Sequence, residues 1–180
     1  MIIQTKDNRQ VRLSRLSADD FDKLVDYLQL LSADTRKRFG PHPFDKKSLM
    51  VLFENLGKHL GYIGQDKQTL DIIAYSIIKI GYLDHDSSRL RSYGLEPDPI
   101  TDCTFAPSVA DQWQGMGIGN SLFGFMLSDL KAKGIKRVIL WGGVQCDNLN
   151  AVDFYLKHGF RTVGQFEYNG WNWDMILDMV

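Results

Sequence analysis

Residues 113–123 read WQGMGIGNSLF, a stretch that places three glycines, Gly115, Gly117 and Gly119, within five positions before an apolar run. A strand candidate, residues 102–109, precedes the glycines, and a helical pattern follows them. A strand, a glycine-rich turn and a helix can hold phosphate together, because unpaired backbone N–H groups at the start of the helix converge on the anion. Glycine leaves that backbone bare and adopts positive φ without strain. The stretch therefore predicts a phosphate site, with a flexible loop before a helix as the plainer alternative.

Two phosphate-binding patterns can be tested against this stretch by their spacing. A dinucleotide-binding turn requires G-x-G-x-x-G, but the glycines here run G-x-G-x-G and Asn120 follows them. A Walker-type loop requires Gly-Lys-Ser/Thr, but Gly124 is followed by Phe125 and Met126. Both patterns fail, which disfavours a nucleotide-dependent oxidoreductase.

A third pattern fits, and a second motif accompanies it. Residues 114–119, QGMGIG, match Q-x-x-G-x-G, and residues 148–160 match N-x-x-A-x-x-x-Y-x-x-x-G-F. With these motifs the sequence resembles the GNAT superfamily of acyl-CoA-dependent N-acyltransferases, whose pyrophosphate loop R/Q-x-x-G-x-G/A lies between the fourth strand and the third helix. Residues 102–179 carry the specific signal, whereas residues 1–101 match only in the arrangement of elements.

The resemblance implies an α/β fold in which helices flank a central mixed sheet with splayed fourth and fifth strands. We expect a single domain over residues 1–180, with a CoA-binding core at 102–160 and acceptor-side helices within 17–56. The order of elements agrees with this fold over nearly the whole chain. The pattern predicts strands at 9–16 (at a sheet edge), 60–64, 70–80, 102–109, 137–144, 161–168 and 171–179. It predicts helices after Ser17 and at 46–56, 120–133 and 150–159. Residues 35–44 are predicted to form a loop, and residues 81–101 a polar excursion.

The resemblance also implies a set of cofactor-binding residues. Backbone groups from Gly115 to Asn120 would cradle the pyrophosphate of coenzyme A, and Ser108 and Val109 would line its pantetheine arm. Pro107 would suit the splayed strand, because proline donates no hydrogen bond to a ladder, although it can equally mark a strand end. Asn148 would bind near the pantetheine or act as the N-cap of the last helix, a role for which Asp147 competes. The complete set is Ser108, Val109, Gln114 (which would shape the turn), Gly115, Met116, Gly117, Ile118, Gly119, Asn120 and Asn148.

Tyr155 is the predicted catalytic residue. By the resemblance, its hydroxyl would protonate the departing thiolate after an amine attacks the thioester, and a backbone N–H near Val109 would stabilise the oxyanion. Without the flanking motif, a tyrosine between Phe154 and Leu156 would be read as a packed helix residue.

The general base has no assigned residue in the sequence. Many relatives place a glutamate on the fourth or fifth strand, but Thr104 and Gly143 stand at the corresponding positions. Asp102, Asp111 and His42 are substitutes, each also readable as a strand-end, cap or loop residue. A water chain, or an amine that arrives neutral, remains open as an alternative.

Composition limits the remaining function classes. The chain has 180 residues, 44% of them apolar and 24% charged, with a net charge of −1, which argues against binding nucleic acid or anionic membranes by bulk attraction. The start of the sequence shows no signal peptide, and two cysteines make no disulfide framework, so we expect a cytoplasmic protein with reduced thiols. The four histidines show no metal-ligand spacing, so no metal is predicted.

The sequence thus predicts an acetyl-CoA-dependent N-acetyltransferase that acts on a small-molecule or peptide amine within a ternary complex. A non-catalytic acyl-CoA-binding module of the same fold is the alternative. The acceptor would be selected by residues 36–44, 81–101 and 165–173, and the basic run Arg36–Arg38 would suit an anionic acceptor. Two tryptophans, Trp171 and Trp173, in a final hairpin would suit a homodimer.

Overall fold

The computed structural model describes residues 1–54 and 57–179. Their contacts divide the chain into two compact units, one formed by Met1–Ile78 with Ala106–Leu130 and the other by Lys79–Phe105 with Lys131–Val180. Among the described residues, no helix combines the length and the apolar character that crossing a membrane would require.

The first unit is built on a sheet whose strands follow the order β1-β2-β3-β4-β5. Pairing is antiparallel between β1 and β2, as at Ile3 opposite Val11, and between β2 and β3, as at Leu13 opposite Gly64. The prediction of an edge position for residues 9–16 is wrong, because the first residues of the chain form a short strand outside them. The strands are β1 (Ile2–Gln4), β2 (Gln10–Arg15), β3 (His59–Asp66), β4 (Ile72–Ile80) and β5 (Asp102–Val109), the last two running on into the second unit.

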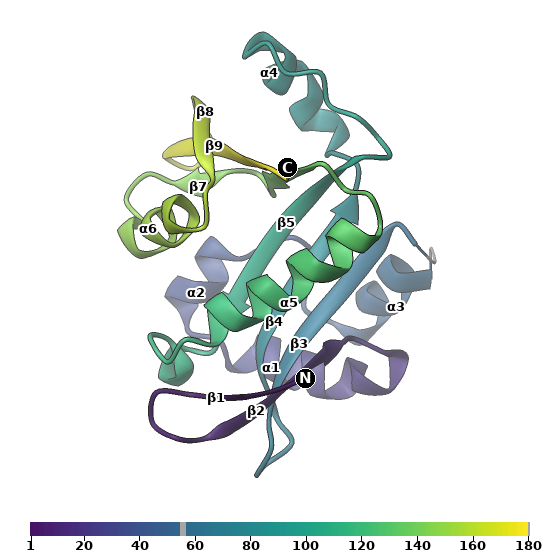
Figure 1. The fold of residues 1–180 in the computed structure, drawn as a ribbon, viewed down its shortest axis with the longest axis vertical. Helices are drawn as coiled ribbons and strands as arrows, with labels where there is room; N and C mark the ends of the chain where they lie inside the picture. Colours follow the sequence, from purple (N-terminus) through teal and green to yellow (C-terminus); the bar gives the residue numbers. More distant parts are fainter. Residues whose placement is uncertain (55–56, 180) are drawn as a thin grey trace. The chain divides into compact units, whose positions relative to one another are not determined.

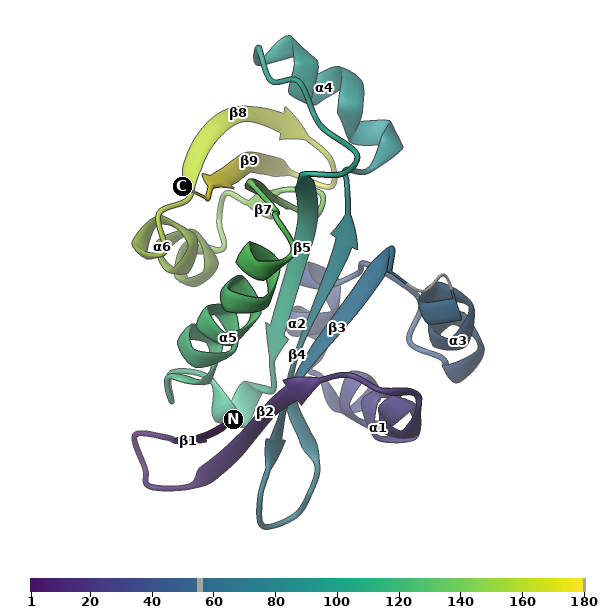
Figure 2. The ribbon, with the colours of Figure 1, turned by 45° about the vertical axis from the view of Figure 1, so that its right-hand side comes forward.

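Helices cover both faces of this sheet. In Figures 1 and 2, α5 (Ile118–Ala132) lies on one face, and α1 (Phe21–Leu30), α2 (Ala33–Arg38) and α3 (Lys46–Glu54) lie on the other. The predicted capping box opens a 3₁₀ turn, Ala18–Asp20, in which the backbone N–H of Ser17 donates to Oδ2 of Asp20 at 2.9 Å, and α1 follows this turn from Phe21. Between the two helix layers, β4 is buried over its first seven residues, as expected of a central strand.

Helix α2 replaces part of the loop that the sequence predicts at residues 35–44. The Ser32 hydroxyl accepts from the N–H of Thr35 at 3.2 Å, and the Asp111 carboxylate accepts from the Ser32 N–H at 3.1 Å and from the Thr35 hydroxyl at 2.7 Å. The partner that anchors this helix is thus distant in the sequence, which is why local patterning misses it. The next predicted helix is confirmed as α3, although its last two positions, 55 and 56, lie outside the described residues.

In the second unit the strand order is β5-β6-β9-β7, and β8 pairs with β9 from Trp171 to Ile176. Strands β5 and β6 pair in parallel, whereas β6, β7 and β8 each pair with β9 in the antiparallel direction. The sheet is therefore mixed, as predicted. Asn169 and Gly170 both have positive φ and form the predicted hairpin turn. The elements are α4 (Ser87–Ser92), β6 (Arg137–Leu140), β7 (Val144–Gln145), α6 (Leu149–Lys157), β8 (Arg161–Glu167) and β9 (Trp171–Asp178).

The structure also differs from the predictions in the second unit and at the start of α5. The strand predicted at 137–144 is broken after Leu140, because Gly142 and Gly143 both take positive φ, and β7 resumes as a separate strand. The excursion at 81–101 contains helix α4, whose Leu90 packs against the sheet residues Ile139 and Ile176. Helix α5 begins within the glycine stretch, two residues before its predicted start.

Candidate functional site

The glycine loop presents open backbone immediately before α5. Gly115 and Gly117 have φ of +75° and +90°, and no heavy atom beyond the neighbouring residues of the chain lies within 4 Å of the position that a β-carbon would occupy on either residue. The helix that starts at Ile118 has no acidic side chain in its first turn. Unpaired N–H groups and the positive end of the helix dipole therefore face a space that an anion can enter.

Two side-chain contacts hold this loop in place. The side-chain amide of Gln114 donates to the backbone carbonyl of Val109 at 3.1 Å, which ties the loop back to the end of β5. The Arg9 guanidinium lies 3.4 Å from the centre of the Trp113 ring, a cation–π contact from the turn between β1 and β2. Sequence reasoning missed Arg9, because the two residues are brought together only by the sheet.

The end of β5 places Ser108 inside the first unit. Its hydroxyl accepts from the Tyr27 hydroxyl at 2.9 Å, and burial raises the pKa of Tyr27 well above its ordinary value. Pairing of β5 with β6 covers four residues and ends at Phe105, so Pro107 lies beyond that ladder. Proline has no N–H to donate to a ladder, so Pro107 suits a position beyond the β5–β6 pairing, as the sequence predicts.

Asn148 is the N-cap of α6. Its side-chain oxygen accepts from the N–H of Ala151 at 3.4 Å, so Asn148 and not Asp147 holds the capping position. A role toward pantetheine stays a prediction.

Tyr155 lies on α6 with three aromatic neighbours. Its ring centre is 6.4 Å from that of Phe105, 5.5 Å from that of Phe154 and 5.3 Å from that of Phe160, and the residue is 7% exposed. Burial raises the pKa of the Tyr155 hydroxyl well above its ordinary value of 10. Tyrosine is protonated at neutral pH even at its ordinary pKa, and burial shifts the Tyr155 pKa further from neutrality.

Two of the predicted substitutes for the base have structural partners. Asp102 accepts from the N–H of Asp98 at 2.9 Å and lies 3.3 Å from the Arg137 guanidinium, and burial raises its pKa. Asp111 anchors the start of α2, as described above. Thr104, at one of the positions where the resemblance led us to look for a base, donates to the backbone carbonyl of Gly81 at 3.0 Å.

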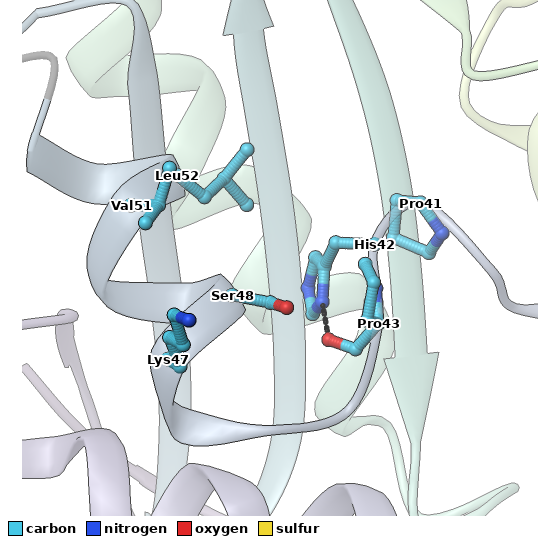
Figure 3. A pocket seen from close by; sticks show the side chains of 7 residues that line it. All are labelled: Pro41, His42, Pro43, Lys47, Ser48, Val51 and Leu52. Carbon is cyan, nitrogen blue, oxygen red and sulfur yellow. Dashed lines mark hydrogen bonds between the residues drawn. The ribbon is translucent and has the colours of Figure 1, made fainter.

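His42, the third substitute, lines an open pocket of about 500 Å³ in the first unit. Figure 3 shows its ring beside Ser48 and Leu52 of α3, and the remaining lining residues are Pro41, Pro43, Lys47 and Val51. The two ring nitrogens lie 2.8 Å from the Pro43 carbonyl oxygen and 3.1 Å from the Tyr75 hydroxyl. Burial lowers the pKa of His42 below its ordinary value of 6.5.

Comparison with known proteins identifies the family. The profile of the acetyltransferase (GNAT) family matches residues 24–160, which include the glycine loop and Tyr155. The chain belongs to the GNAT family of acetyltransferases. A relative from Prochlorococcus marinus, named an uncharacterized N-acetyltransferase ycf52-like, is 28% identical over 155 residues, covering 81% of this chain and 82% of the relative.

Solved structures show the GNAT fold over nearly the whole chain. The GNAT domain of S. lividans PAT superposes with a TM-score of 0.73 at 16% identity, covering 99% of this chain and 96% of that one. The PaiA N-acetyltransferase from Thermoplasma acidophilum, solved in complex with coenzyme A, superposes with a TM-score of 0.65 at 16% identity, covering 94% and 99% of the two chains. Within the part of the GNAT chain that the structure describes, no group of three or more His, Cys, Asp and Glu residues is placed to hold a metal.

Proposed function

We propose that this GNAT protein transfers an acetyl group from acetyl-CoA to a primary amine of a small molecule or peptide, by direct attack within a ternary complex. The observation that carries the proposal is the glycine loop, where Gly115 and Gly117 expose backbone N–H groups at the start of α5 without a neighbouring side chain. A pyrophosphate fits such a loop, because both the N–H groups and the helix dipole favour negative charge.

The residues proposed for CoA extend from this loop along the chain. Backbone groups from Gly115 to Asn120 hold the pyrophosphate, and Gln114 keeps the turn closed through its bond to Val109. Ser108 and Val109, at the end of β5, line the pantetheine arm. Asn148 combines its capping bond with a contact to pantetheine. That the related PaiA structure contains coenzyme A supports this choice of cofactor.

The chemistry assigned to the chain has two parts. A backbone N–H near Val109 stabilises the oxyanion that forms when the amine attacks the thioester. The Tyr155 hydroxyl, which is protonated at neutral pH, donates its proton to the departing thiolate.

The acceptor binds on the side of the helices within residues 17–56. The pocket beside His42 has apolar walls from Pro41, Val51 and Leu52, which suit the body of an organic amine. Arg36, Lys37 and Arg38 are exposed on α2, and their charge favours an acceptor that also carries an anionic group.

Two measurements test the proposal. Calorimetry should detect binding of acetyl-CoA and CoA but not of NAD or FAD. Thiol release from acetyl-CoA should then rise in the presence of at least one primary amine from a panel of amino acids, polyamines and short peptides. No uptake of CoA by folded protein would contradict the whole proposal.

The alternative function is a non-catalytic acyl-CoA-binding module. It is favoured by one observation, the absence of a carboxylate at both Thr104 and Gly143. Binding of acetyl-CoA without thiol release across the whole panel would support this alternative.

A further inference from the structure

Two segments of the first unit line the open pocket beside His42. One is the loop of residues 41–43 and the other is one face of α3, and Figure 3 shows the two segments facing each other. The α3 face consists of Lys47, Ser48, Val51 and Leu52, which recur at the spacing of one helical turn. The volume of about 500 Å³ is in the range of small-molecule sites, so the pocket has room for a small organic acceptor.

The uncharged polar side chains of this pocket are already paired within the protein. The ring nitrogens of His42 lie 2.8 Å from the Pro43 carbonyl oxygen and 3.1 Å from the Tyr75 hydroxyl, and burial lowers the pKa of His42, so the ring is neutral at pH 7. The Ser48 hydroxyl donates to the Asp45 carboxylate at 2.7 Å. Of the described residues that line the pocket, one thus carries a charge at pH 7.

That charge belongs to Lys47, which stands where a cation is unfavourable for the helix. It lies in the first turn of α3, at the positive end of the helix dipole. Its neighbour Lys46 is compensated by an ion pair with Asp22 at 2.7 Å. The pKa of Asp45 is lowered mainly by hydrogen bonds from Ser48, and the exposed ammonium of Lys47 adds a smaller effect without an ion pair to any described residue. A residue that breaks a local rule without compensation is a candidate for function.

The character of the pocket selects among the possible acceptors. One ammonium balances the charge of a carboxylate, whereas a phosphate group carries about −1.5 to −2 at pH 7. No described residue that lines the pocket is acidic, so a second ammonium, as in a polyamine, would meet Lys47 without a counter-charge. Pro41, Val51 and Leu52 present an apolar wall. An amine with an apolar body and one carboxylate matches all three features.

The pocket also adjoins the part of the sheet that is proposed to hold the thioester. The Tyr75 hydroxyl that contacts His42 belongs to β4, so the wall of the pocket rests on this strand. Strand β4 is the neighbour of β5, and the end of β5 carries Ser108 and Val109, the residues proposed to line pantetheine. The acceptor pocket and the proposed cofactor strand therefore belong to adjacent strands of the first unit.

We propose that Lys47 binds the carboxylate of the acceptor, an inference that rests on the proposed function and names its substrate class. The acceptors are small amines with an apolar body and one carboxylate, such as α-amino acids with an aliphatic or aromatic side chain. The Lys47 ammonium donates to the carboxylate, and the apolar wall contacts the body. Lys47 is thus the residue that determines specificity in this pocket.

The test uses two probes of equal shape that lack an amine, 4-methylpentanoate and 4-methylpentanamide, so that binding is measured without transfer. Titrations followed by NMR in saturating CoA should show that wild type binds the carboxylate about fivefold more tightly than the amide, the upper range for an exposed ion pair. The backbone N–H signals of Ser48, Val51 and Leu52 should shift. The preference should weaken in 1 M salt, because salt screens exposed charges.

Three variants assign this preference to one side chain. Lys47→Met should bind the two probes equally, and Lys47→Glu should prefer the amide, because the carboxylate is then repelled. Lys46→Met is the matched control, since it removes the same charge from the adjacent position outside the pocket lining, and it should keep the wild-type preference. Lys47→Glu should not lower the urea midpoint, because an acidic residue suits the first turn of a helix.

Several results would overturn the inference while leaving the proposed function intact. They are an unchanged preference in Lys47→Met, an equal loss in Lys46→Met, shifts confined to residues outside the pocket, and thiol release from acetyl-CoA only with amines that lack a carboxylate. Failure of the proposed function has a different signature. Wild type would then bind the carboxylate with the same dependence on Lys47 but release no thiol with any amine.

Discussion

Arg89 of α4 donates from Nε to Oδ2 of Asp174 on β9 at 2.7 Å, and this bond ties the 81–101 excursion to the sheet of the second unit. The same guanidinium donates to Asp86 at 2.8 Å and lies 3.7 Å from the centre of the Phe166 ring. The Tyr93 hydroxyl also donates to Asp174, at 3.0 Å, and burial raises the pKa of Tyr93 to about 12. The excursion is therefore a packed part of its unit.

Removal of the guanidinium should destabilise the protein strongly. Arg89→Met leaves the carboxylates of Asp86 and Asp174, which are 5% and 2% exposed, without their counter-charge, so the free energy of unfolding should fall by about 3 kcal/mol. Urea unfolding measures this loss in the free energy of unfolding. Arg161→Met, which breaks an exposed pair with Asp178, is the matched control and should cost less than about 1 kcal/mol. Equal losses in the two variants would contradict this account.

A side chain at Gly117 should weaken CoA binding. Gly117→Ala adds a β-carbon in the space proposed for the pyrophosphate and strains a backbone at φ +90°, so the Kd for acetyl-CoA should rise at least about tenfold. Calorimetry measures the Kd. Gly170→Ala controls for strain alone, since Gly170 has φ +105° and equally open surroundings in the β8–β9 turn. If both variants bind acetyl-CoA like wild type, the loop is not the pyrophosphate site.

Loss of the Tyr155 hydroxyl should affect the chemical step selectively. Tyr155→Phe keeps the aromatic packing but removes the proposed proton donor, so turnover should fall by roughly 10²–10⁴-fold while acetyl-CoA affinity stays unchanged. Steady-state kinetics and calorimetry separate the two quantities. Tyr62→Phe, which removes a hydroxyl that donates to Asp129 outside the proposed site, serves as the control. Wild-type turnover in Tyr155→Phe would remove Tyr155 from the mechanism.

His42 should make stability depend on pH below neutrality. Burial lowers its folded-state pKa below 6.5, so as the pH falls through 6.5 the unfolded chain takes up a proton before the folded one does. The free energy of unfolding should therefore fall from pH 7.5 to pH 5.5, and by less in His42→Gln. Urea unfolding at the two pH values measures the difference. If the free energy of unfolding fell more in His42→Gln than in wild type, the lowered pKa of His42 would be contradicted.

The two cysteines should differ in reactivity. Cys103 is buried, and burial raises the pKa of its thiol well above the ordinary value, whereas Cys146 is partly exposed. Ellman's reagent should therefore label one thiol rapidly in native protein and both in urea, because only the thiolate reacts. Cys146→Ser should abolish the rapid phase, and Cys103→Ser should keep it. A rapid phase that survives in Cys146→Ser would show that Cys103 is accessible.

Local patterns predicted the elements whose signals are local. The capping box at Ser17 and Asp20, the strand at 102–109 and the turn at Asn169 depend on neighbouring residues, and each is confirmed. The predictions failed where a distant residue decides the outcome. Helix α2 is one example, because its anchor at Asp111 belongs to another part of the chain.

The candidate site also combines residues that local patterns identify with residues that only the fold brings together. Glycine spacing pointed to the loop, and the resemblance to the GNAT family pointed to Tyr155, because both signals are carried by residues close together in the sequence. The sequence offered His42, Asp102 and Asp111 as substitutes for the general base but gave no means of ranking them. Only the fold brings His42 to Tyr75 and gives Asp102 and Asp111 other partners.

The order of residues by itself determined the family, the glycine loop and most of the helices and strands, because hydrophobic period, capping and glycine spacing act over a few neighbouring positions. The tertiary structure decided which polar side chains are buried and which partners they meet. Those properties depend on contacts between residues far apart in the chain, which exist only once the sheet and its helices have packed.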